Sequence, residues 1–395
     1  MTQSMTTTRY PLATSTWDQA EYDALQRVIE TGRFTMGPEV KNFEQEFASY
    51  FGSKYAVMVN SGSSANLIAI AAAVANPNID LNPGDEVIVP AVSWATTYFP
   101  IHQLGLTLRF VDIDVDTLNI DPQLVVDAIG PATKAVFAVN LLGNPADLET
   151  LAAICTEHGL VLIEDNCESL GSRIGSRYTG TFGLAGTFSS FFSHHISTME
   201  GGLIVTDDDY MYQAMVSLRA HGWTRDLPAD NLIFPKTGVA FEDHFRFVLP
   251  GYNVRPLEMS GALGREQLKK VPGLVSGRQQ NAALFAERFA GRTDLRIQKV
   301  AAESSWFGFS LVLEGRLAGR RAQLVDALTA AGIDSRPIVA GNFARNPVMS
   351  QLRAVVPAEL PAADKIHEDG LFVGNHHYPI PSELDLLLDT IELLD

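Results

Sequence analysis

The stretch "YAVMVNSGSSANLIAIAAAVA", residues 55–75, decides the fold class of this chain. It begins with a short apolar run, passes through small polar residues and ends in a long apolar run of helical length. A strand that is apolar on both faces, followed by such a helix, is typical of the interior of an α/β domain. The residues on either side of this stretch show how far that domain extends.

The flanking segments repeat the alternation of strand and helix. Upstream, residues 39–50 have the period of an amphipathic helix. Downstream, short apolar segments are separated by helix-like ones, and they fall at residues 86–90, 108–113, 135–140 and 160–165. Short strands that are apolar on both faces and separated by helices predict a mostly parallel sheet.

The pattern changes beyond about residue 256. A long helix near residues 256–292 leads to the strand-like "FGFSLVLEG" (307–315) and the helix-like "RAQLVDALTAAGIDSRP" (321–337). We therefore expect a large α/β domain over residues 1–255 and a smaller C-terminal α+β domain over residues 256–395.

Composition restricts the class of protein. The chain has 395 residues, of which 46% are apolar and 19% charged, as in a globular protein with a large core. The net charge of −17 argues against nucleic acid or an anionic membrane as partner. Two cysteines and an N-terminal stretch without an apolar signal region favour a cytoplasmic setting.

Two segments at strand ends have the residues of a binding site. In "NSGSSANL" (60–67), Ser63 and Ser64 precede the long apolar helix, where amides and hydroxyls bind phosphate. The alternative is an ordinary helix N-cap. In "LIEDNCES" (162–169), Glu164 and Asp165 end a strand, where open α/β sheets place ligands. A carboxylate there can pair with a protonated ring nitrogen, or else cap a helix or join an ion pair.

An aromatic residue follows a third strand. Trp94 lies in "PAVSWATT" (90–97), just past residues 86–90, and could stack on an aromatic cofactor. The alternative is an ordinary core tryptophan. In combination and in this order, the three segments and the later "SSFFSHH" (189–195) indicate one binding site on one α/β domain.

The chain resembles the fold-type-I, pyridoxal-phosphate-dependent sugar aminotransferase family, the DegT/DnrJ/EryC/StrS group. The similarity runs from "FTMGPEVKNFEQEFASYFGSKYAVMVNSGSSA" through "LGNPADL", "EDNCESLGS" and "EGG" to "GYNVRPLEMSGALG" (251–264). The resemblance implies the fold type I of pyridoxal-phosphate-dependent transferases, with a large, mostly parallel, seven-stranded sheet domain and a smaller C-terminal α+β domain.

The resemblance also implies roles for individual residues. Asp165 is expected to pair with the ring nitrogen of the cofactor, Trp94 to stack on its ring and Glu168 to lie near its 3-hydroxyl. The phosphate is expected to be held by Ser63, Ser64 and Ser189. In the family the asparagine of "GYN", here Asn253, reaches the phosphate in the neighbouring subunit, which implies a homodimer with shared active sites.

One position departs from the aminotransferases of the family. They have a lysine that bonds covalently to the cofactor, and here His194 stands in its place. No lysine occurs between Lys134 and Lys236 that could substitute for it. An imidazole cannot form that bond, but with a usual pKa of about 6.5 it can accept and deliver protons. The same replacement marks the sugar 3-dehydratase branch of the family.

That branch implies a specific reaction. The enzyme would use pyridoxal phosphate and its amine form, pyridoxamine phosphate, with glutamate as amino donor. It would remove the C3 hydroxyl of a nucleotide-linked 4-keto-6-deoxy hexose and release ammonia. The segments "SHHISTMEGG", "RAHGWTRDLP" and "FVGNHH" resemble this branch, and that resemblance implies GDP-4-keto-6-deoxy-mannose as the expected substrate. We expect His194 and Asp165 to be catalytic. We expect His221 and Arg225 to bind substrate, the arginine because guanidinium pairs well with anionic groups.

Two other functions remain open at this point. One is a CDP-sugar 3-dehydrase coupled to a separate iron–sulfur reductase. The other is an inactive aminotransferase homologue. The neighbouring His195 is expected to point away from His194 along a strand and to serve in packing or hydrogen bonding. No metal is expected, because the paired His376 and His377 lack a further ligand at suitable spacing.

Overall fold

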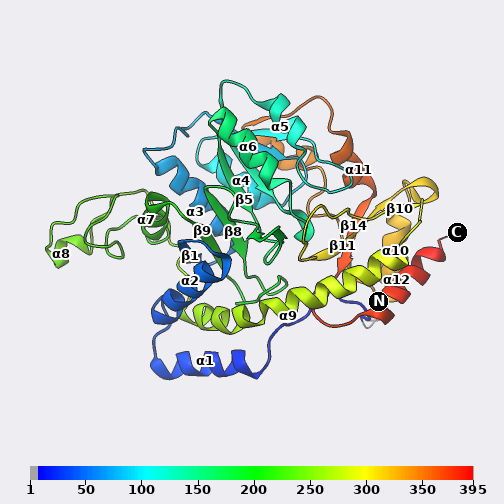
Figure 1. Ribbon diagram of the computed structural model, residues 1–395, viewed down its shortest axis with the longest axis horizontal. Helices are drawn as coiled ribbons and strands as arrows, with labels where there is room; N and C mark the ends of the chain where they lie inside the picture. Colours follow the sequence, from blue (N-terminus) through cyan, green and yellow to red (C-terminus); the bar gives the residue numbers. More distant parts are fainter. Residues whose placement is uncertain (1–7, 395) are drawn as a thin grey trace, which may run out of the picture.

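An eight-stranded sheet forms the centre of the molecule, which the computed structural model describes over residues 8–394 (Figure 1). Its strands follow the spatial order β1 (Tyr55–Val59), β9 (Gly202–Thr206), β8 (Ala185–Ser189), β5 (Val161–Asp165), β4 (Thr133–Val139), β2 (Glu86–Pro90), β3 (Thr107–Val111) and β13 (Ala354–Val355). Only β9 runs antiparallel to its neighbours. The expected mostly parallel α/β sheet is therefore confirmed.

Helices cover both faces of this sheet (Figure 1). One face packs against a layer of helices, α3 (Gly62–Ala75), α4 (Ala95–Gln103), α7 (Asp209–Leu218) and α11 (Pro361–Asp369). The other face packs against α5 (Pro122–Ala128), α6 (Leu148–His158), α2 (Pro38–Phe51) and α9 (Glu258–Arg288). The inner strands, such as β2, β8 and β9, are buried on both sides, which explains why they lack a polar alternation.

Most residues of helix α3 are buried, because its alanines and isoleucines leave no polar face. Its first residue, Gly62, lies so close to β8 that an added Cβ would stand 2.6 Å from Cβ of Ser189. Only glycine permits this approach. The N-terminus of α3 is thereby pressed against the end of β8.

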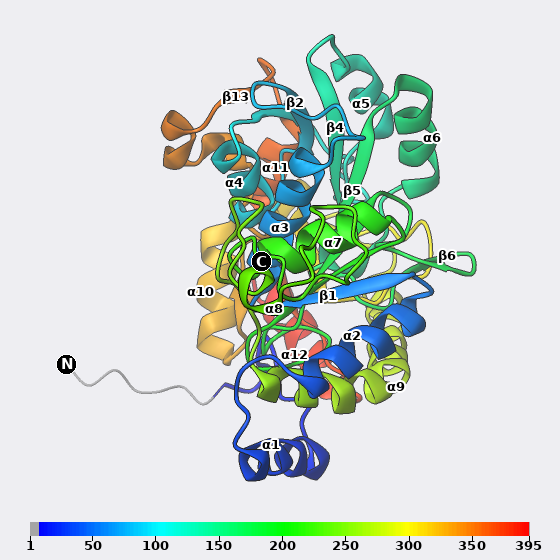
Figure 2. The same ribbon diagram turned by 90° about the vertical axis from the view of Figure 1, so that its left-hand side faces the viewer.

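A second, four-stranded sheet lies C-terminal to α9. It has the order β10 (Leu295–Arg296), β11 (Gly308–Leu313), β14 (Gly370–Gly374) and β12 (Ser335–Arg336). It packs on the second half of α9, on α10 (Arg321–Ala331) and on α12 (Pro381–Glu392). The expected division between residues 255 and 256 stays a prediction, because α9 packs on helices of both parts. Its first half contacts α2 and α1 (Gln19–Thr31), and Figure 2 shows α1 below α2 and α9.

The expected number of seven strands in the large sheet is wrong by one. The eighth strand, β13, comes from the C-terminal part of the chain and pairs in parallel with β3 through Ala354 and Val355. Two residues give no periodic signal, so this strand exists only because the fold brings it to the open edge of β3. A two-stranded sheet, β6 (Arg173–Ile174) and β7 (Arg177–Tyr178), completes the strands of the described residues.

A short projection leaves the body of the molecule at α8 (Ala240–Asp243), as Figure 1 shows. It exposes large apolar side chains, since Phe241 is 84%, Phe245 62% and Phe247 60% exposed. Over residues 8–394, no helix is both long enough and apolar enough to span a membrane.

Candidate active site

A cavity of about 680 Å³ opens where the parallel strands of the large sheet end. Its lining residues follow β1, β2, β4, β5 and β8, as expected for the carboxyl edge of an α/β sheet. The volume is that of a small-molecule site. Among the residues expected at the site, the cavity wall contains Ser63, Trp94, Asp165, Glu168, Ser189 and His194.

The N-terminus of α3 forms one end of the cavity. Its N-cap is Ser61, whose hydroxyl oxygen accepts the N–H of Ser64 at 3.1 Å. The preceding amides of a helix have no partner within the helix, so those of Gly62 and Ser63 are available to an anion. The hydroxyls of Ser63 and Ser189 lie on the same wall.

Ser64 differs from its neighbours, because it does not line the cavity. Its hydroxyl donates to Oδ1 of Asn60 at 2.6 Å, within the turn. The residue that sequence reasoning missed here is Ser61, which lines the cavity and caps the helix. Both interpretations of this turn therefore apply, since one serine is the N-cap while the turn also faces the cavity.

Asp165, the last residue of β5, is held by three donors. Its Oδ2 accepts from Asn66 Nδ2 at 2.8 Å and from Thr97 Oγ1 at 2.9 Å, while Oδ1 accepts the N–H of Cys167 at 3.1 Å. These donors come from α3, α4 and the turn after β5. They fix the carboxylate in the cavity wall, with its charge available to a cation.

Asn66 and Thr97 were missed as functional residues. Both are completely buried, and Asn66 is itself oriented by the hydroxyl of Thr187, which donates to its Oδ1 at 2.6 Å. They lie inside the quoted segments, yet a polar residue near the start of a helix is readily interpreted as part of its capping. Only the convergence of two helices on one strand end shows that they serve Asp165.

Trp94 and Glu168 stand on opposite sides of Asp165 in sequence and both face the cavity. Trp94 is the N-cap of α4 and is 58% exposed, so it is not the core tryptophan of the alternative interpretation. Burial raises the pKa of Glu168 to about 7, although the N–H of Leu142 donates to its Oε2 at 2.9 Å. A carboxyl group with this pKa can hold or release a proton near neutrality.

His194 lies in a loop, although the sequence predicts a strand at this position. Strand β8 ends at Ser189 and β9 begins at Gly202, and the residues between them form turns, one of which is closed by the N–H of His194 donating to Phe191 O at 2.9 Å. The segment ends in Gly201, and glycine is depleted in strands. The imidazole is half-buried and packs against Phe307, with ring centroids 5.2 Å apart.

The electrostatic surroundings keep His194 neutral. Burial lowers its pKa to about 4, and the positive charge of Arg278 acts in the same direction. Its Nδ1 is enclosed and has no hydrogen-bond partner within residues 8–394. The cavity thus presents an unprotonated imidazole whose enclosed Nδ1 accepts no hydrogen bond from any other side chain of the described chain.

His195 does not mirror its neighbour. It is buried, and its Nε2 lies 3.1 Å from the carbonyl oxygen of Ser305, which agrees with a hydrogen-bonding role. Because the segment is a loop, the expected alternation of the two side chains along a strand does not apply. Among the described residues, no group of three or more His, Cys, Asp or Glu side chains is arranged to hold a metal ion.

Besides Ser64, three further expected site residues lie outside this cavity. Asn253 is exposed and accepts from Arg255 Nε at 3.0 Å. His221 and Arg225 both pack against Trp223, with the guanidinium carbon of Arg225 3.8 Å from the ring centroid. In a single subunit, these three side chains do not reach the chain's own cavity.

The C-terminal part of the chain contributes wall residues that sequence reasoning missed. They are Phe307, which packs on His194, Arg336 of β12, and the neighbouring Pro337, Val339 and Phe372. Nothing in the local sequence marks them, because they reach the cavity only when the small sheet packs on the large one. Together the wall offers an anion site, a fixed carboxylate, an exposed aromatic ring and a neutral base.

Comparison with known proteins agrees with this geometry. The DegT/DnrJ/EryC1/StrS aminotransferase family matches residues 15–385. GDP-4-keto-6-deoxy-D-mannose 3-dehydratase from Yersinia pseudotuberculosis is 51% identical over 385 residues, which cover 97% of this chain and 98% of the relative.

Solved structures are similar over the same length. A mutant of GDP-4-keto-6-deoxymannose-3-dehydratase with a histidine replaced by asparagine and with bound GDP-perosamine has a TM-score of 0.95 and 50% identity, covering 97% of this chain and 100% of that one. A structure of GDP-4-keto-6-deoxymannose-3-dehydratase with a trapped PLP–glutamate geminal diamine has a TM-score of 0.94 and 51% identity, with the same coverage. This chain belongs to the DegT/DnrJ/EryC1/StrS aminotransferase family.

Proposed function

We propose that this chain removes the C3 hydroxyl of GDP-4-keto-6-deoxy-D-mannose and gives the 3-deoxy-4-keto sugar. Glutamate is converted to its 2-oxo acid in the same cycle, and its nitrogen leaves as ammonia. The observation that carries the proposal is the neutral imidazole of His194 in a cavity with the other residues of an aminotransferase site. The 51% identity to a 3-dehydratase of this substrate supports it.

The cavity wall fits pyridoxal phosphate and its amine form. The free amides at the start of α3 and the hydroxyls of Ser63 and Ser189 suit the phosphate, and Asp165 suits a protonated ring nitrogen. Trp94 offers its exposed face to the ring. When bound, the cofactor supplies the amine that condenses with a keto group and a ring that stores electrons.

His194 moves the protons in this proposal. Its pKa of about 4 leaves the imidazole unprotonated at neutral pH, ready to take a proton from carbon. Once protonated it is a strong acid for a histidine, and it donates that proton to the departing C3 hydroxyl, which leaves as water. Histidine cannot replace lysine as a covalent tether, so a bound amino group is lost by hydrolysis and not handed back to the protein.

A homodimer with shared active sites is part of the proposal. Asn253, His221 and Arg225 lie outside their own subunit's cavity, and the nearby projection at α8 exposes Phe241 to solvent in the single chain. A second copy that covers this projection would bury its phenylalanines. It would also bring the three polar residues towards the neighbouring cavity.

Complementation tests this arrangement. The variants His194→Asn and Asn253→Ala are each expected to be nearly inactive. In a mixed dimer, one cavity would combine an intact His194 with an intact Asn253 from the other subunit, and activity would return on mixing. A monomer in solution, or two variants that stay inactive after subunit exchange has been verified, would contradict shared sites.

The reaction itself is tested with purified protein, pyridoxal phosphate, glutamate and the 4-keto-6-deoxy sugars of GDP, CDP, dTDP and UDP. We expect ammonia and a 3-deoxy-4-keto product from the GDP sugar without any reductase. A requirement for an added iron–sulfur reductase would assign the chain to the coupled type. Absence of ammonia with every sugar would favour an inactive homologue. We also propose a cytoplasmic setting, which the two free cysteines support.

A further inference from the structure

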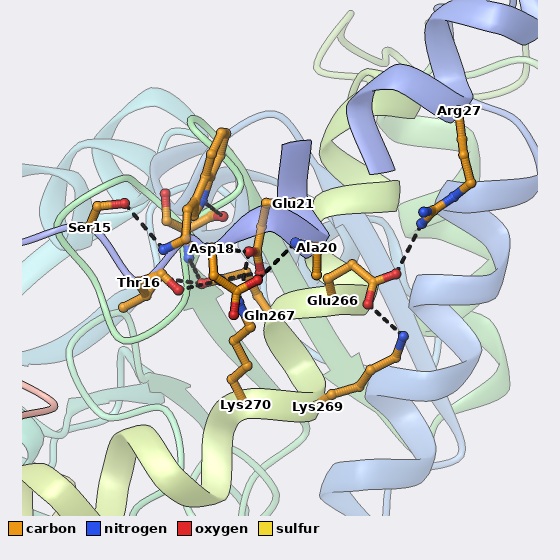
Figure 3. A network of polar contacts seen from close by, with 12 residues as sticks. Ser15, Thr16, Asp18, Ala20, Glu21, Arg27, Glu266, Gln267, Lys269 and Lys270 are labelled. Carbon is orange, nitrogen blue, oxygen red and sulfur yellow. Dashed lines mark hydrogen bonds and ion pairs between the residues drawn. The ribbon is translucent and has the colours of Figure 1, made fainter. Parts of the chain in front are cut away.

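Gln267 of α9 lies at the centre of a buried polar network that Figure 3 shows. Its Oε1 accepts the N–H of Ser197 at 3.0 Å and the hydroxyl of Thr16 at 2.5 Å. Its Nε2 donates to the carbonyl oxygen of Thr16 at 3.2 Å and to Oε1 of Glu21 at 2.7 Å. A carboxamide has two donors and two acceptor positions, and all four are used here. The side chain therefore has one orientation.

Ser197 belongs to the loop that contains His194. The base of this loop is closed by Ser190, whose hydroxyl lies 2.7 Å from Thr198 Oγ1 and whose carbonyl oxygen accepts the N–H of Thr198 at 2.9 Å. A second anchor is the contact of His195 with Ser305. The bond from Ser197 to Gln267 is the third anchor, and it ties the loop to the longest helix of the described chain.

Among the described residues, none forms a hydrogen bond with the His194 ring that would orient it. Its Nδ1 is without a partner within residues 8–394, and its ring contacts are to Phe191 and Phe307. The direction of the imidazole therefore depends on the backbone of the loop. A displacement of a catalytic group by about 1 Å can lower the rate by about a hundredfold.

The partners of Gln267 are themselves fixed. Glu21 is completely buried, and its Oε2 accepts the N–H of Asp18 at 2.8 Å and pairs with Lys270 Nζ at 2.7 Å. This negative neighbour selects an amide at position 267, because a carboxylate there could not donate to it. The N-terminal segment adds one more bond to the loop, from Trp17 Nε1 to the carbonyl oxygen of Ser197 at 2.9 Å.

We propose that Gln267 is a positioning residue for the reaction, which holds the His194 loop through Ser197 and links it to the N-terminal segment Thr16–Asp18. The inference rests on the proposed function of His194 as the proton carrier. Gln267 touches neither the cavity wall nor any expected cofactor residue, so it acts only through the loop.

Glu266, which Figure 3 shows beside Gln267, provides a control residue for this proposal. Glu266, the neighbour of Gln267 on α9, pairs at the surface with Arg27 at 3.0 Å and with Lys269 at 2.6 Å. These exposed pairs connect α1 and α9 but do not contact the loop. Exposed pairs of this kind contribute little to stability. Glu266→Gln should therefore leave both the loop and the reaction unchanged.

The experiment compares Gln267→Met, which keeps the volume and removes all four bonds, with Thr16→Val, which removes one arm bond and keeps Ser197, and with Glu266→Gln. In Gln267→Met we expect kcat to fall by about tenfold to a hundredfold with KM changed by less than about threefold. The apparent pKa in the profile of kcat against pH should also move. Thr16→Val and Glu266→Gln should retain kcat within about threefold.

Hydrogen exchange gives a readout that does not depend on turnover. In the cofactor-free protein, amides of residues 190–200 should exchange faster in Gln267→Met than in wild type or Glu266→Gln. If Gln267→Met does not fold, Trp17→Phe, which removes the N–H donor to Ser197 and keeps an aromatic ring beside Tyr22, should show the same changes at smaller size. Unchanged loop exchange in a folded variant, or loss of kcat with unchanged loop exchange, overturns the inference. A wild-type protein without dehydratase activity would overturn the proposed function instead.

Discussion

The two sides of the cavity are built in different ways. On the sheet side, Asp165 ends a central strand and is held by hydrogen bonds from Asn66 and Thr97, which belong to two helices. On the loop side, His194 stands between β8 and β9, and Nδ1 of its ring has no hydrogen-bond partner among the described residues. The group expected to hold the cofactor is thus part of the scaffold, while the group expected to move protons is not.

This difference shows how one fold can support two reactions. A lysine or a histidine at position 194 can be exchanged without disturbing the hydrogen bonds of the sheet, because no side chain of the described residues bonds to His194 Nδ1. The carboxylate of Asp165 has no such freedom, since its loss would leave buried donors without an acceptor. A substitution on the loop side is therefore expected to change the reaction, whereas one on the sheet side is expected to lower the free energy of unfolding.

The largest expected effect comes from His194→Asn. Turnover should fall by about 10²–10⁴-fold, since that is the usual contribution of a positioned general acid or base. The free energy of unfolding should stay within about 1 kcal/mol of wild type, because within residues 8–394 the ring makes no hydrogen bond that asparagine would break. Steady-state rates and chemical denaturation measure the two quantities. Turnover near the wild-type rate would place the base elsewhere.

The sheet side should show the opposite balance in Thr97→Val. This change keeps the shape of a completely buried side chain but removes a donor to Asp165. We expect the free energy of unfolding to fall by about 1–3 kcal/mol, as for other buried polar groups left without a partner. Thr96→Val is the matched control for stability, since the hydroxyl of Thr96 makes no hydrogen bond within residues 8–394. Equal unfolding free energies for the two variants would contradict the comparison.

The sheet side could be predicted well from the sequence, for a physical reason. Parallel strands end at the same edge, so residues that follow them, such as Trp94 and Asp165, meet there whatever the details of the loops. The N-terminus of α3 could be placed in the same way. The identity of the N-cap could not, because Ser61, Ser63 and Ser64 are chemically alike and the choice depends on the exact start of the helix.

The loop side was harder to predict. His194 was found through a missing lysine, yet its segment was expected to be a strand and is a loop. Its anchor Gln267 and its neighbour Phe307 come from distant parts of the chain, as does the added strand β13. Contacts of this kind depend on how the second sheet and α9 pack, and no local pattern contains that information.

Acid should reveal the neutral histidine of the loop side as a loss of stability. In the folded protein burial lowers the pKa of His194 to about 4, whereas the unfolded histidine titrates near 6.5. Between these values the unfolded chain binds a proton that the folded one does not. Stability therefore rises with pH and falls as the pH drops from 6.5 to 4. The slope is about 1.4 kcal/mol per pH unit for each such histidine.

His194→Asn separates this contribution from that of other histidines. Burial also lowers the pKa values of His195 and His376, so the wild type should lose stability through all three groups. The variant should have a shallower slope, reduced by the contribution of one histidine. Denaturation at several pH values between 4.5 and 6.5 measures the slopes. Identical slopes in the two proteins would mean that His194 is already protonated in the folded state.

Trp94 offers the smallest and most selective change, because it belongs to the cavity wall but not to the packing of either side. Its side chain is 58% exposed, so Trp94→Ala should leave the free energy of unfolding almost unchanged. A stacked aromatic contact contributes about 0.5–1.5 kcal/mol, which predicts a dissociation constant for pyridoxal phosphate about twofold to tenfold higher. Trp94→Phe should recover most of the affinity. Equilibrium titration of the cofactor measures the effect, and an unchanged dissociation constant in Trp94→Ala would mean that the ring does not stack, whatever its place in the wall.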